Sequence, residues 1–251
     1  MIELKSAREI ETMRQAGRIV AGVLRELAAA LRPGITTADL DRLAERLIRE
    51  AGAEPAFKGY QGYPASICAS INDEVVHGIP SPHRVLRDGD LVSLDVGARY
   101  RGYYGDSAAT FAVGHVPAEA RRLLEVTREA LYAGIAAARP GNRLGDIGHA
   151  VQRYVEAAGF SVVRDYAGHG IGRAMHEDPQ VPNYGQPGTG LRLRPGLVLA
   201  IEPMVNAGGH AVRTEADGWT VRTVDGSLSA HFEHTVLITE GEPEILTDGA
   251  F

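Results

Sequence analysis

Apolar residues recur at helical spacing in two stretches near the start of the chain. The longer stretch follows Ser6 and Glu9, which are spaced as a capping box, and it ends near Gly34. The shorter stretch covers residues 40–48. The same arrangement returns within residues 117–159. The pattern therefore predicts four helices, arranged as two successive pairs.

A different pattern, alternation of period two, marks the segment LVSLDVGARYRGYYGDSAATF at residues 91–111. The alternation surrounds a turn near Gly102, so it predicts two antiparallel strands. With Tyr100 and Arg101 as a two-residue loop, positions whose numbers sum to 201 would pair, and Asp95 would face Asp106 across the hairpin. This facing arrangement depends on that choice of loop.

The two halves of the chain share residues at a fixed spacing. Residues of the first half recur 107 positions later, where Arg32, Pro33, Gly34, Asp39, Ala51 and Gly52 are matched by Arg139, Pro140, Gly141, Asp146, Ala158 and Gly159. The same offset carries Asp95, at the end of LVSLD, onto Glu202, at the end of LVLAIE. An offset of 127 carries Asp106 onto Glu233, as though the second half contained 20 extra residues. Acidic residues thus occupy matching positions in both halves.

This repeat predicts an internal duplication of a unit made of two helices and a hairpin. We expect an α+β fold in which two halves, roughly residues 1–115 and 116–251, are related by a pseudo-twofold axis within a single domain, residues 1–251. A central antiparallel sheet, covered by the helices, would bring the four acids together. The alternative is convergence of two similar units, which leaves an ordinary α+β domain.

Composition narrows the class of protein. With 44% hydrophobic and 23% charged residues over 251 positions, the chain is typical of globular proteins. Its formal net charge of −6 provides no basic surface, so no nucleic acid partner is expected. Cys68 is the single cysteine, the amino terminus lacks the apolar core of a signal peptide, and no run approaches the roughly 20 apolar residues of a membrane span. These features favour a soluble cytoplasmic protein.

The four acids at matched positions favour a metal centre. Together they would place a charge of about −4 in one cavity, which two divalent ions balance and which no Lys or Arg of these motifs does. Asp95 and Asp106 taken alone could instead be solvated strand ends. Glu202, however, lies within the apolar run LVLAIEPMV, and Glu233 follows Phe232 and precedes TVLI. Ionised acids are seldom buried in such settings without partners.

Histidine is the remaining residue type that can bind metal or transfer protons. His169 and His176 lie in the glycine-rich segment GHGIGRAMH, and His77 lies in the similar segment VVHGIP of the first half. One such histidine beside glycine is more often structural, but one in each half favours a functional role. Four carboxylates together with His169 would suit manganese, iron or cobalt at least as well as zinc.

Five motifs follow one another along the chain, namely SINDEVVHGIP, SLDVGARYRGYYGDSAATF, GHGIGRAMHEDPQVPNYG, LAIEPMV and HFEHTVLIT. In these motifs, and over nearly all 251 residues, the chain resembles the short, bacterial type I methionine aminopeptidases. The resemblance implies a pita-bread fold built from two related halves, with two divalent ions that could be cobalt, manganese, iron or zinc. It also implies that Asp106 and Glu233 bridge the ions, Asp95 chelates one, His169 and Glu202 bind the other, and His77 and His176 contact the substrate.

The resemblance further implies a pocket for a methionine side chain. Residues that match those of similar bacterial enzymes there are Tyr60, Tyr63, Cys68 and Trp219. Phe57 and Met175 stand where many of those enzymes have cysteine and phenylalanine, so the pocket departs from the family pattern at these two positions. A sulfur and aromatic lining suits methionine, although plain core packing would explain each aromatic residue taken alone equally well.

The implied reaction is hydrolytic removal of the N-terminal methionine from peptides and nascent proteins, with preference for a small second residue. We expect Glu202 to carry the proton, His77 and His176 to stabilise developing charge, and the ions to lower the pKa of bound water from 15.7 towards roughly 7. The expected partner is the amino terminus of a peptide or nascent chain, met transiently near the ribosome by a monomer that binds neither nucleic acid nor membrane.

Two other functions are compatible with this ligand set. Proline-directed peptidases, such as prolidase and aminopeptidase P, resemble the chain around the ligands, but they usually have an additional amino-terminal domain and glycine at the position of Met204. A partner-binding protein that has lost its metals is the other alternative. The presence of all five ligands argues against it, and the metal content of the purified protein would discriminate.

Overall fold

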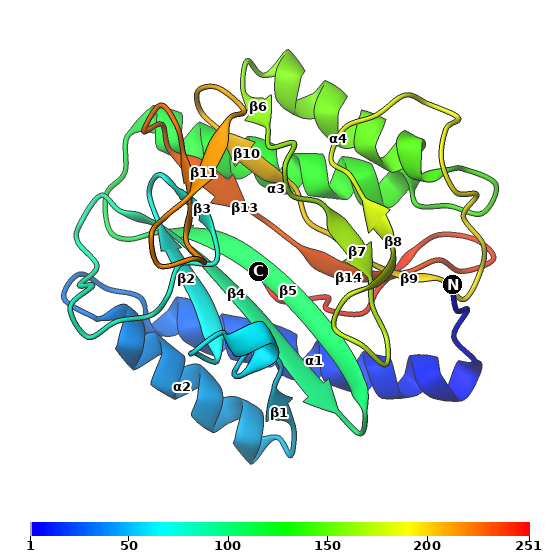
Figure 1. Ribbon diagram of the computed structural model, residues 1–251, viewed down its shortest axis with the longest axis horizontal. Coiled ribbons are helices and arrows are strands. Elements are labelled where there is room, and N and C mark those ends of the chain that lie inside the picture. The colour runs from blue at the N-terminus through cyan, green and yellow to red at the C-terminus, as the bar shows by residue number, and fades with distance from the viewer. Residues whose placement is uncertain (1) are drawn as a thin grey trace.

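All four predicted helices are present in the computed structural model, which describes residues 2–251. The helices are α1 (Ala7–Ala30), α2 (Thr37–Glu50), α3 (Ala118–Ala137), α4 (Leu144–Ala157) and the short 3-10 helix η1 (Tyr60–Gly62). Ser6 and Glu9 form the predicted capping box of α1, in which Ser6 N–H donates to Glu9 Oε2 at 2.8 Å. The pair α1 and α2 lies on one flank of the strands and the pair α3 and α4 on the other (Figure 1).

The strands of the described residues form four sheets, in which every pairing is antiparallel. The strands are β1 (Glu54–Pro55), β2 (Ile67–Ile71), β3 (Glu74–Val76), β4 (Leu91–Tyr100), β5 (Tyr103–Ala112), β6 (Ser161–Val162), β7 (Gly168–Gly170), β8 (Glu177–Val181), β9 (Val198–Ile201), β10 (Met204–Asn206), β11 (Val212–Thr214), β12 (Val221–Thr223), β13 (Ser229–His231), β14 (His234–Leu237) and β15 (Glu244–Ile245). Strands β1, β2, β4 and β5 form one sheet, and the largest sheet has the order β15-β14-β9-β7-β8. The smaller sheets are β13-β10-β6 and β11-β12-β3.

The hairpin of β4 and β5 is present, but the register that we considered for it is wrong. The loop begins one residue later and consists of Arg101 and Gly102, so Asp95 pairs with Ala108 and not with Asp106. Arg101 and Gly102 have φ values of +49° and +85°, and a turn of this kind favours glycine at its second position. The two carboxylates are therefore diagonal neighbours on one face of the sheet.

The elements of the two halves recur with the spacing found in the sequence. Each residue of α2 has its counterpart in α4 107 positions later. An isolated bridge between Thr36 and Val85 recurs with the same offset between Arg143 and Arg192. The hairpin of β11 and β12 lies between the two acids of the second half and has no counterpart between β4 and β5. It accounts for most of the extra length, while the division near residue 115 stays a prediction.

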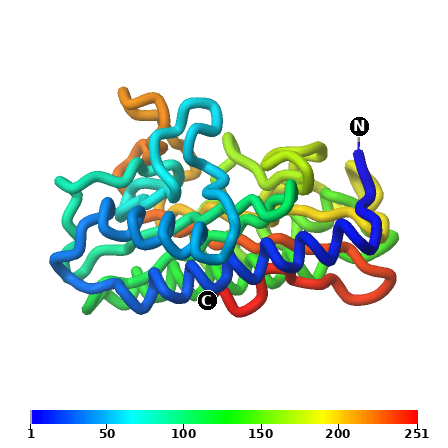
Figure 2. The backbone as a smooth tube through the Cα atoms, turned by 90° about the horizontal axis from the view of Figure 1, so that it is seen from below, coloured from blue at the N-terminus to red at the C-terminus, as the bar shows by residue number. Residues whose placement is uncertain are grey.

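The two halves meet where β5 runs beside β13 and β14. Glu233 N–H donates to Ala108 O at 2.8 Å, and the Thr235 hydroxyl donates to Asp106 O at 2.7 Å. One hydrophobic cluster lies mainly in the first half and another mainly in the second, and Ala109 of β5 belongs to the second cluster. In Figure 2, α1 runs along one side of the molecule, whereas the cyan and orange segments that include η1 and the β11–β12 hairpin project from the opposite side. Within residues 2–251, no helix has both the length and the apolar composition to span a membrane.

Candidate metal centre and substrate cavity

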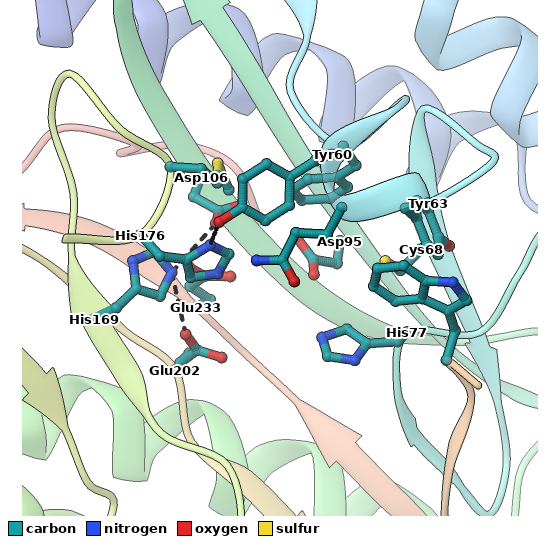
Figure 3. A pocket seen from close by; sticks show the side chains of 14 residues that line it. Tyr60, Tyr63, Cys68, His77, Asp95, Asp106, His169, His176, Glu202 and Glu233 are labelled. Carbon is teal, nitrogen blue, oxygen red and sulfur yellow. Dashed lines mark hydrogen bonds and ion pairs between the residues drawn. The ribbon is translucent and has the colours of Figure 1, made fainter. Parts of the chain in front are cut away.

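A cavity of about 310 Å³ lies where the two halves meet. All the site residues that we predicted line it: Tyr60, Tyr63, Cys68, His77, Asp95, Asp106, His169, His176, Glu202, Trp219 and Glu233. Phe57 and Met175 also line it, as does Gln61, which the sequence analysis did not single out. Figure 3 shows Asp106, His169, His176, Glu202 and Glu233 on one side of this space and Tyr63, Cys68 and His77 on the other, with Asp95 between them. The structure brings these side chains together, and their individual roles stay predictions.

Strands of both halves deliver the acids. Asp95 lies on β4 and Asp106 on β5, whereas Glu202 directly follows β9 and Glu233 lies between β13 and β14. Because β5 runs beside β13 and β14, two acids from each half enter the same cavity. His169, on the interior strand β7 of the five-stranded sheet, lines the same cavity.

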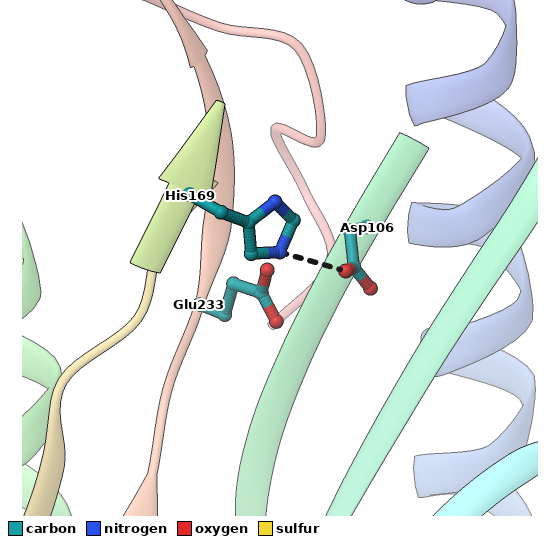
Figure 4. A group of neighbouring side chains, drawn as sticks. All are labelled: Asp106, His169 and Glu233. Carbon is teal, nitrogen blue, oxygen red and sulfur yellow. Dashed lines mark ion pairs between the residues drawn. The ribbon is translucent and has the colours of Figure 1, made fainter. Parts of the chain in front are cut away.

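Asp106, His169 and Glu233 form the tightest group (Figure 4), in which one ligand atom of each lies within 4.8 Å of the others. His169 Nε2 lies 3.7 Å from Asp106 Oδ2 and 3.5 Å from Glu202 Oε1. On its other side, His169 Nδ1 donates to Gly170 O at 2.8 Å, which leaves Nε2 to point at the acids. Burial acts to lower the pKa of His169, but Asp106 and Glu202 outweigh it, and the pKa is raised.

No lysine or arginine of the described residues balances the charge of the acids in this cavity. Burial, together with the charges of Asp106 and Glu202, raises the pKa of Asp95 and of Glu233 well above the ordinary range. Asp95 Oδ1, Asp106 Oδ1 and Glu233 Oε1 are buried and have no hydrogen-bond partner among the described residues. No Lys or Arg of the described chain lines the cavity. Divalent ions would satisfy both the charge and these oxygens, so the residues present fit a metal centre.

His231 is a neighbour of this group that the sequence analysis missed. It is buried, its Nε2 has no hydrogen-bond partner within residues 2–251, and this atom lies 3.6 Å from Glu202 Oε2. Glu202 therefore lies between two imidazoles, those of His169 and His231. The sequence feature that could have identified His231 is the HFEH segment. His231 precedes Glu233 by two residues there, so the two side chains point to the same face of an extended chain.

Aromatic residues from two segments, residues 57–63 and Trp219, close the opposite wall. Tyr63 and Trp219 meet edge to face with ring centroids 5.0 Å apart, and the Tyr63 hydroxyl donates to Ile67 O at 3.0 Å and to Gly78 O at 3.1 Å. Tyr63 thus also serves the packing that we considered as its alternative role. Cys68 pairs in register with Asp95, and burial raises the pKa of its thiol, so it stays protonated.

The two histidines predicted to contact the substrate are held by aromatic residues that line the same cavity. His176 Nδ1 shares a 2.8 Å hydrogen bond with the Tyr60 hydroxyl. His77 has a φ of +61° and lies edge to face with Trp219, at a centroid distance of 6.3 Å. Burial lowers the pKa of both imidazoles, with the charge of His169 adding to the effect at His176, so both are neutral at pH 7.

Known proteins are similar to this chain in both sequence and structure. Residues 11–240 match metallopeptidase family M24. The chain is 59% identical over 247 residues to a methionine aminopeptidase of Clostridium acetobutylicum, an alignment that covers 98% of this chain and 99% of that protein. A solved methionine aminopeptidase from Thermotoga maritima superposes with a TM-score of 0.97 and 53% identity, covering 98% of this chain and 99% of that one. The chain belongs to the methionine aminopeptidases of metallopeptidase family M24.

This membership confirms the predicted pita-bread architecture and, with the buried group of Asp106, His169 and Glu233, indicates binding of divalent metal. A solved prolidase from Pyrococcus furiosus shares the fold at a TM-score of 0.77 and 26% identity, and the match covers 98% of this chain but 65% of the prolidase. The methionine aminopeptidases match this chain over almost their whole length, whereas the proline-directed enzyme matches over part of its own.

Proposed function

We propose that this chain removes the N-terminal methionine from peptides and nascent proteins by metal-dependent hydrolysis, with preference for a small second residue. The observation that carries the proposal is the cavity itself, where four carboxylates, with no Lys or Arg of residues 2–251 in the lining, face a wall of sulfur and aromatic groups. One side of the cavity suits cations and the other suits a thioether.

We infer that two divalent ions bind at the carboxylate side. Asp106 and Glu233 would lie between the ions, Asp95 would bind one of them, and His169 with Glu202 would bind the other. Bound ions would supply a nucleophilic water at neutral pH and polarise the scissile carbonyl. The donor set of oxygens and one imidazole is compatible with cobalt, manganese, iron or zinc.

The protein's own groups would orient the peptide and transfer the proton. Glu202 would take the proton of the attacking water and pass it to the leaving amide. If the Tyr60 hydroxyl donates to Nδ1 of His176, the neutral imidazole carries its hydrogen on Nε2 and can donate to the oxygen that becomes negative. His77, held against Trp219, would bind the peptide at the other side of the cavity.

The methionine side chain would lie among Phe57, Tyr63, Cys68, Met175 and Trp219. Five of the cavity's lining residues thus contribute carbon or sulfur surface to this wall, which favours a flexible apolar thioether over a charged side chain. A cavity of about 310 Å³ leaves limited room beyond the first residue, so a small second residue should be preferred.

Release of the first residue from Met-Ala, Met-Lys and Ala-Pro peptides tests the proposal. We expect cleavage of the Met-Ala peptide alone, loss of this cleavage with a chelator, and recovery when manganese, iron, cobalt or zinc is restored. Cleavage of the Ala-Pro peptide would assign the chain to the proline-directed activity. Cleavage of none, by protein that retains no metal, would favour a binding protein.

We also propose that the chain acts as a monomer in the cytoplasm and meets nascent chains transiently near the ribosome. The single buried Cys68 supports a cytoplasmic setting, since one cysteine cannot form an internal disulfide. The acidic net charge supports a transient encounter, since it gives the protein no basic surface to hold nucleic acid. The mass in solution, measured by light scattering, and sedimentation with ribosomes at physiological salt would test it.

A further inference from the structure

The loop between β7 and β8, residues 171–176, carries Met175 and His176 into the cavity. Its first part is connected to β5, where Tyr104 N–H donates to Gly172 O at 2.9 Å. Its far end is connected to the amino-terminal segment of the chain through the side chain of Glu177, the residue directly after His176. The position of His176 therefore depends on what holds Glu177.

Glu177 holds both the loop and the amino-terminal segment with one carboxylate. Its Oε1 accepts hydrogen bonds from Arg173 N at 2.7 Å and from Ala174 N at 3.1 Å. Its Oε2 accepts a hydrogen bond from Lys5 Nζ at 2.7 Å. The Lys5 side chain is only 2% exposed, so this is an ion pair shielded from water on the lysine side.

The surroundings of Lys5 are shaped for its side chain. A Cβ atom on Gly172 would lie 2.2 Å from Lys5 Cε, so the absence of a side chain at Gly172 gives the lysine its path through the loop. The backbone of Lys5 is fixed as well, because its N–H donates to Gly196 O at 2.7 Å. Hydrogen bonds thus hold both the backbone and the ammonium group of Lys5, so the side chain connects the loop to a fixed point of the backbone.

A second, exposed connection runs parallel to the first. Glu9 Oε1, near the start of α1, accepts hydrogen bonds from Arg173 Nη2 at 3.0 Å and from the Tyr103 hydroxyl at 2.8 Å. Exposed ion pairs of this kind contribute little free energy. The connection through Lys5 is the one that would be costly to break, since it leaves the Glu177 carboxylate, which is only 18% exposed, without its cation.

We propose that Lys5 is a positioning residue for the reaction. Through Glu177 it fixes the β7–β8 loop, and thereby sets where His176 meets the scissile peptide and where Met175 closes the methionine pocket. This proposal rests on the proposed function, because it assigns Lys5 to the site that performs it. None of the five predicted metal ligands lies on the loop, so metal binding should not depend on Lys5.

Substitution of Lys5 by Met, which keeps the length and removes the charge, tests the proposal. In Lys5→Met we expect kcat/KM for a Met-Ala peptide at 25 °C to fall roughly 10- to 100-fold, the effect of displacing a positioned group by about 1 Å. The affinity for Mn²⁺, measured by calorimetry, should stay within about twofold of wild type. Lys58→Met is the matched control, because Lys58 makes an ion pair of the same 2.7 Å length with Glu45 on the surface, and this variant should keep the wild-type kcat/KM.

The double variant Lys5→Met with Glu177→Gln separates positioning from stability. It leaves no buried charge, so its melting temperature should recover relative to Lys5→Met, while kcat/KM should stay low because the connection to the amino-terminal segment is still absent. If kcat/KM returns together with the melting temperature, or if folded Lys5→Met is as active as wild type, the pair serves stability alone and the proposal is wrong. A wild-type protein that cleaves no Met-Ala peptide would instead overturn the proposed function.

Discussion

Asp106 belongs to the tightest group of ligand atoms, with His169 and Glu233, and one of its oxygens has no partner among the described residues. Asp106→Asn keeps the size of the side chain and removes the charge. We expect Mn²⁺ binding and peptide cleavage to be lost together, with kcat/KM reduced by more than the roughly 100-fold that loss of an outer partner of a ligand can cost. Calorimetry and the Met-Ala assay measure the two effects. Asp88→Asn, at an exposed acid, is the control, and an Asp106→Asn protein that retains full activity would contradict the proposed centre.

The two tyrosines of the cavity should respond differently to loss of the hydroxyl. Tyr60→Phe removes the hydrogen bond to His176 Nδ1, so we expect kcat to fall about 3- to 10-fold with a smaller change in KM, as for loss of roughly 1 kcal/mol of hydrogen bonding. Tyr63→Phe removes bonds to Ile67 O and Gly78 O, so it should chiefly lower the free energy of unfolding, by about 1 kcal/mol. Steady-state kinetics and urea unfolding distinguish the pair. Equal effects on kcat would show that Tyr60 does not orient His176.

At the scale of elements, the turns that precede α2 and α4 are equivalent. Gly34 and Gly141 have φ values of 92° and 93°, with open space around the position of a Cβ atom. Gly34→Ala and Gly141→Ala should therefore each lower the free energy of unfolding by roughly 1–2 kcal/mol through backbone strain alone. Gly22→Ala, inside α1, is the opposite control and should raise stability by up to about 1 kcal/mol. Chemical denaturation measures all three, and a clear difference between Gly34→Ala and Gly141→Ala would contradict the equivalence.

The elements that the sequence predicted correctly are those whose signals are local. The helix of residues 7–30 has its capping box and its apolar spacing within its own residues, and the hairpin of β4 and β5 has its alternation. The register of that hairpin was missed because it depends on Arg101, a residue other than glycine, adopting a positive φ beside Gly102. A shift of the loop by one residue does not show in the hydrophobic pattern, although it decides which residue faces Asp95.

At the scale of the whole molecule, the meeting of the four acids could be predicted because the repeat makes two distant segments equivalent. A repeat carries no information about contacts that break its symmetry. The ion pair of Lys5 and Glu177 joins residues 172 positions apart, and the β11–β12 hairpin brings Trp219 to the cavity from an insertion in one half only. His231, too, faces Glu202 across two strands that only the folded chain brings together.

Metal that binds where the two halves meet should stabilise the entire fold. Two acids from each half face one another beside the contact of β5 with β13 and β14, so a cation that binds there joins the halves and is absent from the unfolded chain. An ion at 100 times its Kd adds about 2.7 kcal/mol to the free energy of unfolding. For a chain of this length, roughly 2–4 °C per kcal/mol gives a fall in Tm of about 5–10 °C on chelation. Calorimetric scans with chelator, and again with Mn²⁺ restored, measure this fall, and Asp106→Asn should have lost the response. If activity depends on metal but Tm in the native protein does not, the ions cannot be bound between the four acids.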